Sequence, residues 1–314
     1  MEDYPKTLVE LERRFAGEQA CREYLFALRW PNGFVCPRCR ATGKVWPTAR
    51  GLWLCGACRH QASVTAGTIF QDTRLPLALW FRAIWYVTSQ KNGVSALGVQ
   101  RVLGLGSYQT AWAWLHKLRR AMVRPGRESL RGLVEVDETY LGGLEEGSAG
   151  RGTEDKALVA VAAEAAGSGS GIGRIRLRHV PDASSRSLQG FITQAVEPGS
   201  TVRTDGWQGY AGLEQRNYHH QVQVIGKGNR RQASQLLPRV HRVVSLLKRW
   251  LMGTHQGAVS HTHLEYYLDE FVFRFNRRTS ASRGKLFYRL VQQAVQVDPA
   301  PYQKLIHPQR VGAG

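Results

Sequence analysis

Apolar residues recur at helical spacing in the first part of the chain. Over residues 75–90, "LPLALWFRAIWYVTSQ", a proline stands where a helix would start and apolar residues return every three or four positions, which predicts a helix. A Ser-initiated helix is expected over 95–103, and a Gly-rich turn separates it from a second Ser-initiated helix that starts at Ser107. Two short helices joined in this way are typical of a helix-turn-helix unit, which we place at residues 74–123.

Beyond residue 130 the pattern changes to alternating strands. Strands separated by a helix indicate an α/β sheet with helices laid over it. Asp137 and Asp205 each fall at the expected end of a strand, where an isolated Asp is usually only a turn residue. By strand alternation Glu135 shares a face with Asp137, which makes it a candidate to support a site there, but a solvated or salt-bridged role is the main expectation for both Glu135 and Glu138. The expected segments are the strands "GLVEVDETYLGG", "KALVAVAAEA" and "GRIRLRHV", the Ser-capped helix "SSRSLQGFITQAV" and the strand in "STVRTDGWQGY".

Four of the five cysteines form two CxxC pairs. Fifteen residues separate the pairs, a spacing that suits a tetrahedral Cys₄ zinc site, and "KVWPTARGLWLC" between them predicts a β-hairpin. This indicates a zinc ribbon at residues 31–62, after an N-terminal helical segment at 1–30. The zinc is structural, since four thiolates leave no open position; the alternative is four unliganded thiols in a small core. The ligands are Cys36, Cys39, Cys55 and Cys58, whereas Cys21 lies in a helical pattern and is expected to be a buried apolar residue.

The charge of the chain points to a polyanionic partner. Forty-three Lys and Arg against 24 Asp and Glu give a net charge of +19, and Asp72 is the single acid between residues 24 and 127. Nucleic acid explains such a balance better than a membrane does. If the helix-turn-helix binds DNA, the start of its second helix meets the bases; otherwise it is a helical hairpin that only packs. The candidate base readers are Tyr108, Gln109 and Thr110, and the candidate phosphate contacts are Lys117, Arg119 and Arg120.

Neither a membrane segment nor a secretion signal is recognisable. The longest apolar candidate, which begins at Leu75, is thirteen residues long and contains Arg82. The first fifteen residues are acidic and amphipathic, unlike a secretion signal. We therefore expect a cytoplasmic protein, associated with the nucleoid if it binds DNA.

Six motifs over roughly residues 20–280 resemble, in their order, the insertion-sequence transposases of the DDE type. They are "CPRC…CGAC", "TAGTIFQDTRLPLALWFRAIW", "VEVDETYLGG", "TDGWQGY", "SLLKR" and "YLDEFVFRFNRR". The closest likeness is to the bacterial group in which a zinc ribbon and a helix-turn-helix precede an RNase-H-like, integrase-like core. The resemblance implies a multidomain α/β protein whose core, a mixed sheet with flanking helices, spans residues 130–280 and is followed by a C-terminal tail at 281–314.

The resemblance also implies the catalytic residues. Asp137 and Asp205 match the two metal-binding aspartates, which would hold two Mg²⁺ or Mn²⁺ ions. The third ligand of the family, usually Glu or Asn, stands four residues before the Ser of "SLLKR", where this sequence has His241; Lys248 matches the family's lysine seven residues further on. A histidine there binds a metal or its water, carries a proton, or marks an impaired copy, unless it is an ordinary surface residue. Arg242 and Arg249 lie on the solvent side of the same predicted helix and would contact DNA.

The implied function is transposition. Such a protein binds the terminal inverted repeats of its insertion sequence, cleaves the DNA ends and joins them to target DNA. Its partner would be double-stranded DNA, and it would act at least as a dimer because two ends must be held together. The alternatives are a catalytically inactive DNA-binding regulator derived from a transposase and a structure-specific nuclease of the RNase H fold.

Overall fold

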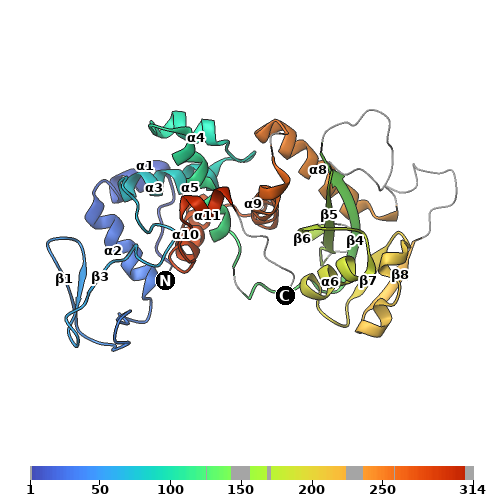
Figure 1. Ribbon diagram of the computed structural model, residues 1–314, viewed down its shortest axis with the longest axis horizontal. Helices are drawn as coiled ribbons and strands as arrows, with labels where there is room; N and C mark the ends of the chain where they lie inside the picture. Colours follow the sequence, from blue (N-terminus) through green and yellow to red (C-terminus); the bar gives the residue numbers. More distant parts are fainter. Residues whose placement is uncertain are drawn as a thin grey trace. The chain divides into compact units, whose positions relative to one another are not determined.

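The computed structural model describes residues 2–124, 126–142, 156–167, 171–223, 236–257 and 259–307. The chain divides into two compact units, and we describe each by itself (Figure 1). The first unit combines Met1–Arg124 with Ser280–Gly314, and the second is Pro125–Thr279.

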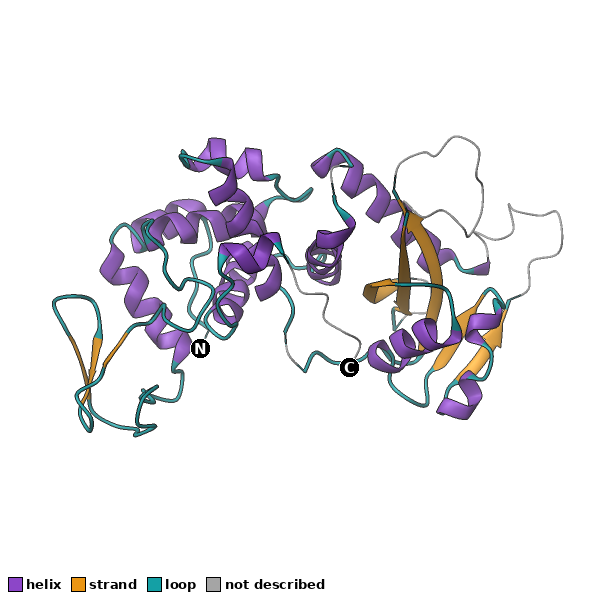
Figure 2. Ribbon diagram, viewed as in Figure 1, coloured by secondary structure: helices purple, strands orange, loops and turns teal. Residues whose placement is uncertain are grey.

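A small antiparallel sheet of the first unit contains Cys55 of the second CxxC pair, and the first pair precedes its first strand. Its strands are β1 (Val45–Pro47), β2 (Trp53–Cys55) and β3 (Gln61–Ala62), in the order β1-β2-β3. Figure 2 distinguishes the strands of both units, in orange, from the helices, in purple. β1 and β2 form the predicted hairpin, with Val45 opposite Cys55. The second CxxC pair begins at Cys55, the last residue of β2.

Helices form the rest of the first unit. The Ser-initiated helices and their turn have the predicted form: the side chains of Ser95 and Ser107 accept hydrogen bonds from the amides of Gly98 and Thr110, and Gly104 ends α4 at a φ of +63°. Within the described residues, no helix is both long enough and apolar enough to cross a membrane. The helices are α1 (Leu8–Arg14), α2 (Glu18–Arg29), α3 (Leu77–Ser89), α4 (Ala96–Leu103), α5 (Tyr108–Ala121), α10 (Arg283–Ala294) and α11 (Tyr302–Ile306).

The C-terminal segment contains helices where a tail is expected at residues 281–314. The ring of Phe287 in α10 is fully buried and packs against Phe15, Phe81 and Trp85. Apolar residues at helical spacing in "RGKLFYRLVQQA" form the buried face of this helix. α10 is therefore part of the core of the first unit, together with residues from the other end of the chain.

A five-stranded mixed sheet forms the centre of the second unit. Its order is β6-β5-β4-β7-β8; β4, β5 and β6 are antiparallel neighbours, whereas β7 and β8 run parallel to β4. Three antiparallel strands followed by two parallel ones are the arrangement expected of an RNase-H-like core. The strands are β4 (Leu133–Leu141), β5 (Ala157–Ala165), β6 (Ile172–Val180), β7 (Thr201–Thr204) and β8 (His219–Val222).

Helices cover both faces of this sheet. α6 (Ser185–Ala195) packs on the face to which Val134 and Val136 of β4 point. α8 (Pro238–His255) and α9 (Leu264–Asn276) pack on the opposite face, where Leu141 lies. Because side chains alternate along a strand, the odd-numbered residues of β4 face α8. Three short 3₁₀ turns complete the unit: η1 (Gln208–Tyr210), η2 (Leu213–Arg216) and η3 (His261–His263).

Candidate functional site

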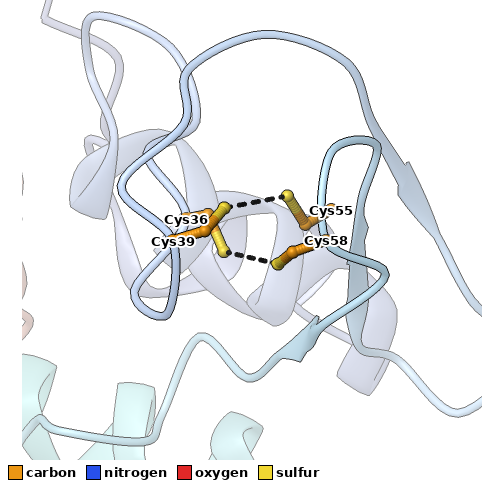
Figure 3. A group of neighbouring side chains, drawn as sticks. All are labelled: Cys36, Cys39, Cys55 and Cys58. Carbon is orange, nitrogen blue, oxygen red and sulfur yellow. Dashed lines mark hydrogen bonds between the residues drawn. The ribbon is translucent and has the colours of Figure 1, made fainter.

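The four cysteines of the two CxxC pairs converge in the small sheet (Figure 3). The Sγ atoms of Cys36 and Cys58 are 3.7 Å apart, and those of Cys39 and Cys55 are 3.9 Å apart. Four sulfurs bound tetrahedrally at the usual zinc–sulfur length are separated by about 3.8 Å. In the described part of the chain, this is the one group of at least three His, Cys, Asp or Glu side chains gathered closely enough to hold a metal ion.

The two CxxC turns also have the same backbone geometry. The amide of Arg40 donates to the carbonyl of Cys36 at 2.9 Å, and the amide of Arg59 donates to the carbonyl of Cys55 at 3.1 Å. Both arginines have a positive φ, 61° and 59°, which turns the chain back after each pair. The donor set, its spacing and the paired turns fit a structural zinc ion, as predicted.

Cys21 lies apart from the cluster, as expected of a core residue. Its side chain is fully buried in α2, with its Sγ 3.9 Å from the carbonyl of Phe15. Burial raises the pKa of this thiol to about 12. A thiol that stays protonated in an apolar environment is inert, so Cys21 is a packing residue.

The first turn of α5 carries the candidate base readers. Tyr108 is 49% exposed and Gln109 is exposed, so both side chains are accessible to a ligand. Thr110 is half-buried, and its hydroxyl lies 2.9 Å from that of Ser107. Two of the three candidates therefore have the exposure that contact with bases requires.

The candidate phosphate contacts of α5 do not share one environment. Arg119 is only 2% exposed, and its Nη1 lies 3.4 Å from Nε2 of buried His116. A buried guanidinium cannot reach a phosphate, so the expectation for Arg119 is corrected: it lies on the packed face of the helix. Lys117 and Arg120 are half-buried. Burial lowers the pKa of Lys117, and the charge of Asp72 opposes that shift.

The two aspartates belong to neighbouring parallel strands. Asp205 directly follows the last residue of β7, as predicted, but Asp137 lies in the middle of β4 and not at its end, because pairing with β5 continues to Leu141. In the register of β4 and β7, Glu135 pairs with Arg203. Each aspartate stands two residues beyond this pair, so Asp137 and Asp205 lie at the same end of the two neighbouring strands although they are far apart in the sequence.

The "TDGWQGY" segment holds Asp205 in place. Its Oδ1 accepts a hydrogen bond from the amide of Trp207 at 2.9 Å, across Gly206, which has a φ of +85°. The indole of Trp207 donates to the carbonyl oxygen of Ala183 at 2.8 Å. A Cβ on Gly209 would lie 2.6 Å from that same oxygen. The two glycines and the tryptophan therefore anchor the turn against the start of α6.

Tyr210 connects this segment to β4. Its hydroxyl donates to Oε2 of Glu138 at 2.6 Å, and its side chain is fully buried. The pKa of Tyr210 is raised well above its ordinary value, first by burial and then by the charge of Glu138, with smaller effects from Asp137 and Asp205. A single phenol therefore lies within electrostatic range of both candidate metal ligands.

His241 lies beside Asp137. Its Nε2 is 3.9 Å from Asp137 Oδ2, and the two side chains are 36% and 17% exposed. This separation is longer than a hydrogen bond. Two donor atoms that each lie about 2.1 Å from one ion are about 3 to 4.2 Å apart, depending on the angle between them, and the observed distance falls within that range. The structure therefore brings His241 and Asp137 together across two elements.

The rest of α8 follows the predicted helix faces. Lys248, Arg242 and Arg249 are exposed. The apolar side packs on the sheet through Val240, Val243, Leu247, Trp250 and Leu251, with Val244 partly buried against them. His241 and Lys248 thus border the packed face.

Glu135 is salt-bridged, one of the roles expected for it, but the sequence did not reveal its partner. It is fully buried and forms an ion pair with Arg239, with 2.6 Å between Oε1 and Nη1. Its Oε2 accepts hydrogen bonds from the amides of Arg239 and Val240 at 2.7 and 3.1 Å. Its place on the same face of β4 as Asp137 was visible in the sequence. Its partners, however, lie on α8, and only the fold brings them close.

Comparison with known proteins gives matches over both units. An ISXO2-like transposase domain matches residues 129–276, and a transposase zinc-ribbon domain matches residues 16–61; together they span more than half of the chain. A relative described as an uncharacterized protein in transposable element ISH50 of Halobacterium salinarum is 28% identical over 284 residues, which cover 83% of this chain and 92% of the relative.

One solved structure is also similar. It is a chain of the simian T-cell lymphotropic virus intasome in complex with PP2A regulatory subunit B56 gamma, with 14% identity over 68% of this chain and 72% of that chain. The TM-score of 0.31 is too low to establish a common fold. The family matches are more specific, because they cover the cysteine cluster and the whole five-stranded sheet. The chain belongs to the insertion-sequence transposases that join an N-terminal zinc ribbon to an ISXO2-like transposase domain.

Proposed function

We propose that this protein cleaves the ends of its insertion sequence and joins them to target DNA at a metal centre formed by Asp137, Asp205 and His241. The observation that carries the proposal is the 3.9 Å separation of His241 Nε2 and Asp137 Oδ2. In support, Asp137 and Asp205 each stand two residues beyond the paired Glu135 and Arg203, at the same end of β4 and β7. These three side chains are less tightly grouped than the four cysteines, so bound ions would have to draw them together.

The donor set suits a divalent cation. Carboxylate oxygens are ligands for Mg²⁺ and Mn²⁺, whereas imidazole favours Mn²⁺ over Mg²⁺. Two ions held in such a site supply activation of the attacking water or 3′-hydroxyl and stabilisation of the leaving oxygen. Asp137, Asp205 and His241 would be the residues that hold these ions.

The basic residues of α8 would hold the DNA backbone. Lys248 follows His241 by two helical turns, and its exposed ammonium is free to contact a phosphate near the scissile bond. Arg242 and Arg249 are exposed on the same helix and would contact neighbouring phosphates. These contacts orient the DNA without reading its sequence.

Recognition of the DNA ends would fall to the first unit. Tyr108 and Gln109 are exposed in the first turn of α5, where a recognition helix meets base edges, with Thr110 beside them. Lys117 and Arg120 would contribute phosphate contacts, and Arg119 is left out because it is buried. Both substrates are double-stranded DNA, so we place the protein's action at the nucleoid. At least a dimer is required to hold two ends together.

The test is cleavage of a labelled duplex that carries the inverted repeat flanking the gene. Zinc-loaded protein with Mg²⁺ or Mn²⁺ should release a free 3′-hydroxyl at the transposon end. Asp137→Ala and Asp205→Ala should abolish cleavage and leave binding of the end intact, because neither residue contributes to the first unit.

The alternatives give different results in the same assay. A catalytically inactive regulator would bind the end and fail to cut it in either metal, which would overturn the proposal. A structure-specific nuclease would cut branched duplexes regardless of their terminal sequence, and joining of the cut end to a second DNA would not occur.

A further inference from the structure

The first turn of α8 is capped from another element. Its N-cap residue is Leu237 and its first residue is Pro238, so the helix has no side-chain cap of its own. The amides of Arg239 and Val240, which an N-cap side chain would normally satisfy, donate instead to Oε2 of Glu135 on β4. A buried carboxylate at this end is also favoured by the positive end of the helix dipole.

Both oxygens of the Glu135 carboxylate accept hydrogen bonds from α8. Its Oε1 accepts from Nη1 of Arg239, and Nε of Arg239 donates to the carbonyl of Gly171 at 3.1 Å. Glu135 is fully buried and the side chain of Arg239 is 11% exposed, so water does not compete for these bonds. With these three bonds made to α8, Glu135 is a structural partner of the helix and not a metal ligand.

These contacts determine where His241 stands. Glu135 and Asp137 are alternate residues on one face of β4, and Arg239 and His241 lie within the first turns of α8. β4 therefore contacts α8 at two successive positions: Glu135 forms an ion pair with Arg239, and Asp137 lies beside His241. A change in the Glu135–Arg239 contact would therefore change the position of His241 relative to Asp137.

Glu138 makes a corresponding contact on the other face of β4. It accepts the hydroxyl of Tyr210 at 2.6 Å, and Tyr210 ends the η1 turn that follows Asp205. The phenol is fully buried, so the bond ties that turn firmly to the strand. Asp205 lies between β7 and this tie.

We propose that the two glutamates flanking Asp137 are positioning residues. Glu135 fixes His241 through the N-terminus of α8, and Glu138 fixes Asp205 through Tyr210. This inference rests on the proposed function, since it names the residues that hold His241 and Asp205 in place relative to Asp137. Groups that support ligands in this way typically change metal affinity by about 10- to 100-fold when they are altered.

The test of Glu135 uses Mn²⁺ affinity, measured by titration calorimetry on zinc-loaded protein. Glu135→Gln should weaken Mn²⁺ binding about tenfold when His241 is present, but less than twofold in a His241→Ala background, because the glutamate acts through the histidine. Hydrogen exchange in the first turn of α8 should also become faster. Equal losses in both backgrounds would overturn the inference.

The matched control is Glu164→Gln. Glu164 is a buried acid on β5 with a 2.8 Å ion pair to Arg174 and hydrogen bonds from the amides of Arg131 and Arg174. Its loss costs a comparable set of bonds elsewhere in the same unit, so Mn²⁺ affinity should not change. If Glu135→Gln does not fold, Arg239→Gln replaces it in the same double-mutant cycle. That variant keeps both hydrogen bonds from backbone amides of α8 to Glu135, so the loss of Mn²⁺ affinity should be smaller. This loss should again be absent in the His241→Ala background.

The test of Glu138 separates positioning from ligation. Tyr210→Phe removes the bond but leaves the carboxylate, and it should weaken Mn²⁺ binding about tenfold and speed hydrogen exchange over residues 203–210. Glu138→Gln keeps an oxygen that accepts the phenol and should have a smaller effect. The reverse order would make Glu138 a ligand and overturn its assignment. Tyr218→Phe, which removes a buried 3.0 Å bond to the carbonyl of Val196, is the control and should leave the affinity unchanged.

Failure of this inference differs from failure of the proposed function. If the wild-type protein neither cuts DNA ends nor binds Mn²⁺, the metal centre itself is wrong. If it does both and Glu135→Gln and Tyr210→Phe behave like their controls, the centre stands and the positioning roles are wrong.

Discussion

The imidazole of His241 and the carboxylate of Asp137 lie 3.9 Å apart, the first on α8 and the second on the central strand of the sheet. The contact occurs where the insertion-sequence transposases that this chain resembles usually have Glu or Asn. Imidazole nitrogen is a softer ligand than a carboxylate oxygen, so a histidine in this place changes which metal ion the centre should prefer.

The metal preference is the first prediction. Wild-type protein should cleave transposon ends faster with Mn²⁺ than with Mg²⁺, and His241→Glu should reduce that ratio about tenfold, because a carboxylate suits Mg²⁺ better than imidazole does. Single-turnover cleavage rates in the two metals measure the ratio. His261→Glu, at an exposed position in η3, is the control and should leave the ratio unchanged. An unaltered ratio in His241→Glu would argue against ligation by His241.

Zinc removal should disable the first unit. The buried cluster beneath the ribbon contains only a few residues, including Phe34 and Ala62, so the bound ion has to supply much of its stability. Cys39→Ser should reduce the zinc content measured by atomic absorption and abolish end binding. Cys21→Ala should retain the zinc, since Cys21 lies outside the cluster. Unchanged end binding by zinc-free protein would contradict this prediction.

Two neighbouring arginines of α5 should behave differently when replaced. Arg120→Ala should weaken binding to all DNA sequences and lower the salt slope of the affinity by about one, as expected for loss of one phosphate contact. Arg119→Ala should instead lower the melting temperature, because Arg119 is buried beside His116. Fluorescence anisotropy at several salt concentrations and thermal unfolding distinguish the two effects.

Asp269 should make stability depend on pH. Burial, followed by the charge of Glu265, raises its pKa to about 7, while Arg127 opposes the shift. A carboxyl whose folded pKa exceeds its unfolded pKa is most favourable at low pH, so its contribution should be lost as the pH rises from about 4 to about 7. Asp269→Asn should remove this loss and be more stable than wild type by on the order of 1 kcal/mol at pH 8. Urea unfolding at pH 5 and pH 8 measures the difference, and a gain independent of pH would exclude Asp269 as its source.

Local patterns were sufficient to predict several features. Two CxxC pairs at the correct spacing predicted the cysteine cluster, and Ser95, Ser107 and Gly104 predicted the limits of α4 and the start of α5. Helical periodicity also predicted that Arg242 and Arg249 lie on the solvent side of α8, where both are exposed. The helix limits depend on residues within a few positions of one another. The cysteine cluster joins Cys36 and Cys58, which are 22 positions apart, but the spacing of its two pairs is recognisable in the sequence.

Features that depend on pairing between distant segments were not predictable in this way. The central place of Asp137 in β4 depends on β5, and the burial of Arg119 depends on the packing of α5. Strand alternation separates Glu135 from Glu138, but nothing in the sequence indicates that the first accepts hydrogen bonds from α8 and the second from Tyr210.

The sequence by itself therefore determined which residues carry the candidate chemistry and which helices and turns present them. Only the tertiary structure decided which of them meet. The parallel pairing of β4 with β7 puts Asp137 and Asp205 at the same end of neighbouring strands, and the packing of α8 on the sheet brings His241 to 3.9 Å from Asp137. These contacts join segments that are far apart in the sequence, and no local pattern in either segment indicates how close the two lie in the folded protein.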